Sequence, residues 1–238
     1  SDSAEMQELL QLLQSENSTA MDKHRLADIT LIRTLRVSHI ADLMLENCKR
    51  IMGVSVCSSE KNDSYKRYAD FTLLVLPYPG VEFFKHFNAH HPEMAPLLHF
   101  DWTSWPPVNR PPGSLAFDHD LISRWDSVTI TSNYLKTILY TLCDSECRGL
   151  LVHCISGWDR TPLFISLLRL SLWADEEIHT SLNAEQILYL TIAYDWMMFR
   201  HQLVLRQSHS EDIFGFCFYF LEYITGPEFC VETITNRI

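Results

Sequence analysis

The chain has 238 residues, of which 47% are hydrophobic and 21% charged, so its composition is that of a globular protein rather than a disordered chain. Nineteen Lys and Arg residues against thirty Asp and Glu residues give a formal charge of -11, which excludes broad electrostatic attraction to nucleic acid or to an anionic membrane. An anionic ligand must therefore meet a local positive site.

The length predicts a single domain over residues 1–238, with residues 1–24 as a peripheral N-terminal helix and loop. The longest strongly apolar run, residues 163–173, is interrupted by Arg169 and is shorter than the roughly 20 residues that span a bilayer. The start of the chain is polar and acidic, unlike a secretory signal. The seven cysteines are odd in number and lack a CxxC pair, which is typical of reduced thiols. We therefore expect a soluble, cytoplasmic chain.

Strands and helices alternate in the first part of the chain. The apolar run at 37–45 predicts a buried strand or the helix leading from one, and the run at 71–76 predicts a strand that a Pro- and Gly-rich segment ends. A short helix at 81–87 and another strand at 96–101 follow. Prolines and two tryptophans in residues 102–114 predict a structured loop.

Helices dominate the second part. Residues 127–142 predict a helix, 149–153 a compact strand and 162–173 another helix. Two long apolar helices are expected at 181–204, capped at Ser181 or Asn183, and at 211–224. The order predicts an α/β fold: a central mixed, mostly parallel sheet flanked by helices, with additional C-terminal helices.

The segment that carries chemistry is VHCISGWDRTP at residues 152–162. Five residues separate Cys154 from Arg160, and the two lie between a predicted strand and a predicted helix. The N-terminus of a helix presents free N–H groups and partial positive charge, which bind phosphate and favour a thiolate. The pattern predicts a cysteine-dependent phosphatase with Cys154 as nucleophile.

The neighbouring residues fit the same chemistry. Arg160 offers a planar fork for two phosphoryl oxygens. The Thr161 hydroxyl can donate to the cysteine sulfur and help it leave when a phosphocysteine is hydrolysed. Gly157 allows a tight turn with the backbone close to the phosphate. The alternative is a buried core cysteine beside a helix, with an incidental Arg and Asp.

The motif HCxxGxDRT resembles the signature of myotubularin-type phosphoinositide 3-phosphatases, within the cysteine-based phosphatase superfamily. Tyrosine phosphatases usually lack its Trp158-Asp159 pair. The run TPLFISLLRLSLWAD, with ILYLTIAYDWMMF and DIFGFCFYFLEYI downstream, is similar to the egg-derived tyrosine phosphatase branch of that family. This resemblance covers roughly the whole chain, most loosely before Arg25.

The resemblance implies a soluble enzyme that removes the D3 phosphate of phosphatidylinositol 3-phosphate and phosphatidylinositol 3,5-bisphosphate at a membrane surface, without a metal or other cofactor. The implied catalytic residues are Cys154, Arg160 and Asp159. The implied substrate-binding residues are Ile155, Ser156, Gly157, Trp158 and Thr161. Most active myotubularins carry Ser-Asp where this chain has Ile155-Ser156, which leaves its headgroup preference open. The resemblance implies no particular protein partner. We recognise no lipid-binding module in these residues, so we expect membrane recruitment to come from elsewhere.

The general acid that protonates the leaving oxygen has competing candidates. Tyrosine phosphatases carry it in a Trp-Pro-Asp loop, but Pro107 stands here where the Asp is expected. The resemblance favours Asp159 over Asp101 or Asp118. Asp159 could instead fix loop amides as an acceptor.

Several other residues keep two interpretations. His153 either orders the loop or is a buried strand residue. Trp102 and Trp105 either wall the site or fill the core, and the pair Lys66-Arg67 either contacts a second phosphate or is a solvated face. The competing functions are a protein tyrosine or dual-specificity phosphatase and a catalytically inactive phosphoinositide-binding module.

Overall fold

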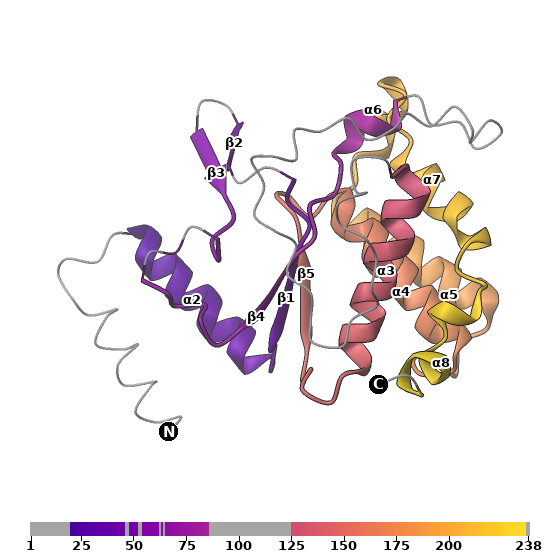
Figure 1. The fold of residues 1–238 in the computed structure, drawn as a ribbon. Helices are drawn as coiled ribbons and strands as arrows, with labels where there is room; N and C mark the ends of the chain where they lie inside the picture. The colour runs from indigo at the N-terminus through magenta and orange to yellow at the C-terminus, as the bar shows by residue number, and fades with distance from the viewer. Residues whose placement is uncertain are drawn as a thin grey trace.

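A computed structural model of the protein has a three-stranded parallel sheet at its centre (Figure 1). The strand order is β4 (Thr72–Val75), β1 (His39–Asp42) and β5 (Leu150–His153). All three strands run parallel, so their carboxyl ends meet at one edge, where ligands of α/β proteins bind. The structure describes residues 20–45, 48–51, 54–61, 63, 65–85 and 125–236.

Successive side chains of each strand point to opposite faces of the sheet, and both faces are covered by other elements. The residues that pack with helix α2 (Ala20–Thr34) are Ile40, Leu73 and Leu151. Those that join the larger core are Ala41, Leu74 and Val152. Figure 1 shows α2 on one side of the sheet and the remaining helices on the other. Apolar residues on both faces explain why these strands read as continuous apolar runs.

The larger core lies between the sheet and helices α3 (Ser127–Cys143) and α4 (Arg160–Ala174). The Asp126 carboxylate caps α3 by accepting a hydrogen bond from the amide of Thr129 at 2.7 Å. Tyr78, fully buried, packs edge-on against Phe164 of α4. These contacts fix the start of α4, where the candidate site lies.

The two long C-terminal helices predicted at 181–204 and 211–224 are broken into shorter elements, so that prediction is wrong in its lengths. The first is divided into α5 (Ala184–Leu190), a π-helix η5 (Thr191–Met198) and α6 (Leu203–Ser208). The second becomes α7 (Ile213–Tyr219) with a 3-10 turn, η6 (Phe220–Glu222). The cap at Asn183 is confirmed, in a capping box with Gln186. Two small elements follow, η7 (Pro227–Phe229) and α8 (Val231–Thr235).

The α/β class and the parallel strands at 39–42, 72–75 and 150–153 are confirmed, as are the helices at 127–143 and 160–174. The 81–87 helix is a 3-10 turn, η1 (Val81–Phe84). Helix α2 and the antiparallel pair β2 (Cys48–Ile51) and β3 (Val54–Cys57) were not predicted. That pair forms a separate two-stranded sheet, and the three strands of the central sheet that the structure describes are parallel.

Some predictions fall on other parts of the chain. The helix at 5–13, the strand at 96–101 and the loop at 102–114 lie outside the described residues. Cysteines 143, 147, 154, 217 and 230 are free, whereas Cys57 is disulfide-bonded, so the prediction of reduced thiols is wrong for Cys57. None of the helices described here has both the length and the apolarity needed to cross a membrane.

Candidate active site

The loop formed by residues 154–160, called the signature loop below, begins where β5 ends and leads directly into α4. Cys154 is 9% exposed at its start, and Arg160 is the first residue of α4. Gly157 has φ +73°, a left-handed conformation that disfavours other residues. The predicted strand, tight turn and helix around Cys154 are thus present.

The Cys154 sulfur accepts a hydrogen bond from the Thr161 hydroxyl at 3.2 Å. Thr161 lies in the first turn of α4 and is itself buried. A hydroxyl donor at this distance stabilises negative charge on the sulfur, both in a free thiolate and in a departing one. The Thr161 hydroxyl therefore lies where it can donate to the cysteine sulfur, as the sequence analysis expects.

The Arg160 guanidinium is held by backbone carbonyl oxygens in the segments that follow two strands of the sheet. Its Nη1 donates to the carbonyl oxygens of Leu43, just after β1, and Tyr78, just after β4, each at 3.1 Å. The Tyr78 hydroxyl shares a 2.7 Å hydrogen bond with Thr131, which fixes that segment against α3. The guanidinium is therefore oriented before any ligand arrives.

Asp159 contacts Arg206 and His201, which lie in and just before α6. Its Oδ1 accepts from His201 Nδ1 at 2.9 Å, and its Oδ2 accepts from Arg206 Nη2 at 2.7 Å. Arg206 also donates to Glu211 at 2.9 Å. Burial alone raises the pKa of Asp159, but hydrogen bonds from His201 and Arg206 outweigh it and the pKa is lowered. Asp159 is thus a carboxylate in this structure.

His153 lies at the other end of the loop, among carboxylates. Its Nδ1 contacts the Cys154 carbonyl oxygen at 3.1 Å and its Nε2 contacts Glu60 Oε1, with Asp42 Oδ1 3.9 Å away. Burial lowers the pKa of His153, but the hydrogen bond and charge of Glu60 prevail and raise it to about 9. The same contact lowers the pKa of Glu60 against its own burial.

An open pocket of about 460 Å³ adjoins the signature loop. Its lining includes Cys154, Ile155, Ser156, Trp158, Asp159 and Arg160. Of the predicted site residues, Gly157 and Thr161 do not line it but shape the loop and contact the sulfur. Glu82 and Arg206 also line the pocket, and the sequence interpretation did not find them.

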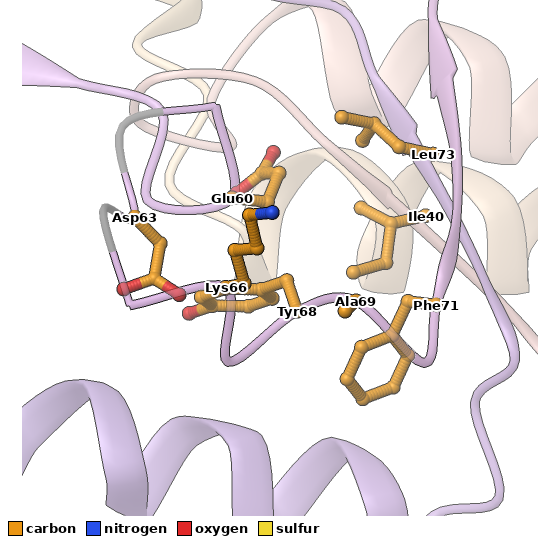
Figure 2. Close-up of a pocket in the computed structure, with 8 residues that line it drawn as sticks. All are labelled: Ile40, Glu60, Asp63, Lys66, Tyr68, Ala69, Phe71 and Leu73. Carbon is orange, nitrogen blue, oxygen red and sulfur yellow. The ribbon is translucent and has the colours of Figure 1, made fainter.

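The pair Lys66-Arg67 is not part of this pocket. Arg67 forms ion pairs with Asp22 at 3.0 Å and Asp63 at 2.6 Å. Lys66 lines a separate pocket of about 200 Å³ together with Glu60 and Tyr68 (Figure 2). The solvated-face interpretation therefore fits Lys66, which is exposed, but not Arg67, whose side chain is 11% exposed and ion-paired. Asp101, Asp118, Trp102 and Trp105 lie outside the described residues.

Among the described residues, one group has the composition of a metal site: ligand atoms of Asp42, Glu60 and His153 lie within 4.8 Å of one another. The Lys61 ammonium is 2.7 Å from Asp42 Oδ2, and His153 pairs with Glu60. The carboxylates are therefore already compensated by cations of the protein, and this group does not fit a metal ion.

A Cys and an Arg at the two ends of a loop between a parallel strand and a helix define the fold and site of a cysteine-based phosphatase. Comparison with known proteins narrows this class. The chain is 53% identical over 228 residues to the mouse protein "Phosphatidylinositol-3,5-bisphosphate 3-phosphatase MTMR14" and 53% identical over 231 residues to the human protein of that name. It is also 36% identical over 76 residues to the MTMR4 3-phosphatase of Xenopus laevis.

These alignments cover 93% and 94% of this chain but 35% of each MTMR14 protein, so the chain spans about a third of the length of those relatives. The MTMR4 match covers 32% of this chain and 6% of the relative. No family model and no solved structure matches the chain. The chain is a homologue of the myotubularin-related MTMR14 proteins, which confirms the family that the signature loop indicated.

Proposed function

We propose that the chain is a phosphoinositide 3-phosphatase that hydrolyses the D3 phosphate of phosphatidylinositol 3-phosphate and phosphatidylinositol 3,5-bisphosphate. The observation that carries the proposal is the pocket in which Cys154 and the oriented Arg160 both lie, with the Thr161 hydroxyl on the sulfur. The names of the MTMR14 relatives support the choice of lipid substrate.

The reaction proceeds in two displacements. The Cys154 thiolate attacks phosphorus, a sulfur–phosphorus bond forms, and the bond to the inositol oxygen breaks. Arg160 Nη1 is held by backbone carbonyls, and we assign Nε and Nη2 to the phosphoryl oxygens. Water then attacks the phosphocysteine, and Thr161 stabilises the departing sulfur.

We assign Asp159 as the acid that protonates the inositol oxygen, which requires that Asp159 first gains a proton. Arg206 and His201 hold it as a carboxylate, and a proton must be gained before the leaving group departs. Arg206 also lines the pocket, so a phosphate bound there competes with Asp159 for the guanidinium. That competition removes one interaction that lowers the pKa of Asp159 and favours its protonated form.

The remaining assignments belong to the same proposal. Residues 1–238 form one catalytic domain, and Ile155, Ser156, Gly157 and Trp158 shape the headgroup site. Trp158, 38% exposed at the pocket, offers an apolar face to the substrate. The partner is a phosphoinositide headgroup, met by a cytoplasmic protein that associates transiently with a membrane surface; the charge of -11 disfavours nucleic acid.

The test is phosphate release from short-chain phosphatidylinositol 3-phosphate, with the 4- and 5-phosphate isomers and a phosphotyrosine peptide alongside. Release confined to 3-phosphorylated lipids, lost in Cys154→Ser and retained in Cys147→Ser, is the expected result. Cys147 is a suitable control because it is a free thiol before β5 and does not line the pocket. Preference for the peptide identifies a protein phosphatase, and no release from any substrate identifies a binding module.

A further inference from the structure

The residue before the nucleophile is bonded through both of its ring nitrogens. His153 Nδ1 faces the Cys154 carbonyl oxygen at 3.1 Å, and Nε2 faces Glu60 Oε1. Both partners are acceptors only, so the ring satisfies both contacts only when both nitrogens carry a proton. The geometry therefore requires the imidazolium form of His153.

Glu60 is the partner that makes this form stable. It lies in the turn after β3, and its carboxylate contacts the ring of His153 at the end of β5. The other carboxylate facing the ring, Asp42, is 3.9 Å away and is already neutralised by Lys61 at 2.7 Å. It also accepts a hydrogen bond from the Met44 amide at 2.7 Å.

We infer that Glu60 is a positioning residue of the signature loop, acting through His153, whose ring it holds against the carbonyl of Cys154. The Cys154 carbonyl is the first peptide group of the loop, so its direction sets that of the amide that follows. The imidazolium also places a fixed positive charge beside the sulfur-bearing residue, where it favours a thiolate. The inference deepens the proposed function and rests on it only for the kinetic readout.

Glu60 has no sequence signal of this kind because 93 residues separate it from His153. Two other titratable groups lie near it: Tyr68, whose pKa is raised by burial and then by the charge of Glu60, and Asp28 of α2, which lines a pocket of about 340 Å³ together with Glu60 and His153. Lys66 and Asp63 line the adjoining pocket with Glu60 (Figure 2). Of these groups, His153 is the one in direct contact with the catalytic loop.

The experiment compares Glu60→Gln with wild type and with Glu146→Gln. The Gln side chain keeps an acceptor oxygen for His153 but loses the charge. Glu146 is exposed and lies before β5, at the opposite end of the strand from Cys154. Its substitution removes the same charge without touching the loop, so it controls for the change in net charge.

Three measurements are made. An NMR titration follows the pKa of His153, expected at about 9 in wild type and lower in Glu60→Gln, where burial acts without the charge of Glu60. Peptide mass spectrometry follows the rate of iodoacetamide alkylation of Cys154 at pH 7.5, expected to fall about tenfold from loss of a neighbouring cation. The pH profile of kcat on short-chain phosphatidylinositol 3-phosphate is measured for both proteins. We expect the ionisation of His153 to appear at a lower pH in Glu60→Gln than in wild type.

The outcomes separate this inference from the proposed function. If the histidine titration and the alkylation rate change while no lipid is hydrolysed even by wild type, the inference stands and the substrate assignment fails. If Glu60→Gln behaves like Glu146→Gln in titration and alkylation, the positioning role is overturned whatever the substrate. Lower thermal stability with unchanged titration and alkylation marks Glu60 as structural and likewise overturns it.

Discussion

The two ends of the signature loop are anchored by opposite arrangements of charge. At the β5 end, one histidine lies among carboxylates, and the pKa of His153 is raised to about 9. At the α4 end, one carboxylate contacts the Arg206 guanidinium and the His201 ring, and the pKa of Asp159 is lowered. Each end thus keeps its central residue ionised at neutral pH.

The difference lies in what surrounds each charge. The β5 end uses residues from β1 and the turn after β3, which are part of the sheet region. The α4 end uses His201 and Arg206, from the segment in and just before α6. The candidate nucleophile is therefore held by the sheet region and the candidate acid by the C-terminal helices. Disturbing one region should change one half of the chemistry.

Asp159→Asn gives the largest effect on the helical side. If Asp159 is the general acid, turnover of the lipid falls about 10²-fold or more. The loss shrinks for a substrate with a good leaving group, such as para-nitrophenyl phosphate, because that oxygen departs without a proton. Kcat on both substrates is the measurement, with Asp101→Asn, which should lose less, as comparison.

An equal loss on the two substrates would mean that Asp159 only fixes the loop through Arg206 and His201. A larger loss in Asp101→Asn would move the acid to that residue. The two results are distinguishable because a positional defect lowers the first displacement for every substrate, whereas a missing acid lowers it only for poor leaving groups.

Arg206→Ala is the next largest change. The Arg206 and Asp159 side chains are 18% and 11% exposed, and removal of one partner leaves a largely buried carboxylate with His201 alone. We expect the free energy of unfolding to fall by about 3 kcal/mol. Urea denaturation measures it. The matched control is Arg33→Ala, which breaks the exposed pair with Asp70 and should cost less than about 1 kcal/mol.

Similar losses in both variants would show that the Asp159 pair contributes no more than a surface ion pair. In that event the α4 end is held by its helix contacts and not by charge. Both pairs join a guanidinium and a carboxylate, at 2.7 Å and 2.6 Å, but they differ in exposure and in that Arg206 also donates to Glu211, so part of a larger loss in Arg206→Ala belongs to that second pair.

The elements around the site were predictable because their signals are local. Residues 150–153 form an apolar run, and the Gly157 turn and the start of α4 follow within a few positions. Helix α2 was missed because β-branched residues such as Ile29 and Thr30 give it a weak helical pattern. The change from α5 to the π-helix η5 and the end of that helix before α6 were missed because the sequence stays apolar across both positions.

The partners that set the charges of the site were not predictable from the sequence. Arg206 and His201 lie 47 and 42 residues from Asp159, and Glu60 lies 93 residues from His153. Only the folded chain brings them together, and a single Arg or Glu in a polar stretch has a solvated face as its ordinary interpretation. The motif thus specified the candidate reacting groups, while tertiary contacts specify the ionisation of His153 and Asp159.

The smallest expected effect concerns stability at the two extremes of pH. The pKa of His153 is raised from 6.5 to about 9, so its contribution is fully present below 6.5 and is lost as the pH rises through 9. This loss is at most about 3 kcal/mol, and less because the side chain is 25% exposed. The pKa of Asp159 is lowered, so its contribution is present above about 3.9 and is lost as the pH falls further.

Urea denaturation of wild type, Glu60→Gln and Arg206→Ala from about pH 2 to about pH 10 tests this opposition. Glu60→Gln should flatten the alkaline decline between 6.5 and 9 and, because His153 lowers the pKa of Glu60, should also remove the share of the acid decline that Glu60 contributes. Arg206→Ala should flatten the acid decline alone, since its cation is what opposes protonation of Asp159. If Arg206→Ala also flattened the alkaline decline, the two ends of the loop would be coupled through the loop itself, and the division between sheet and helices would not hold.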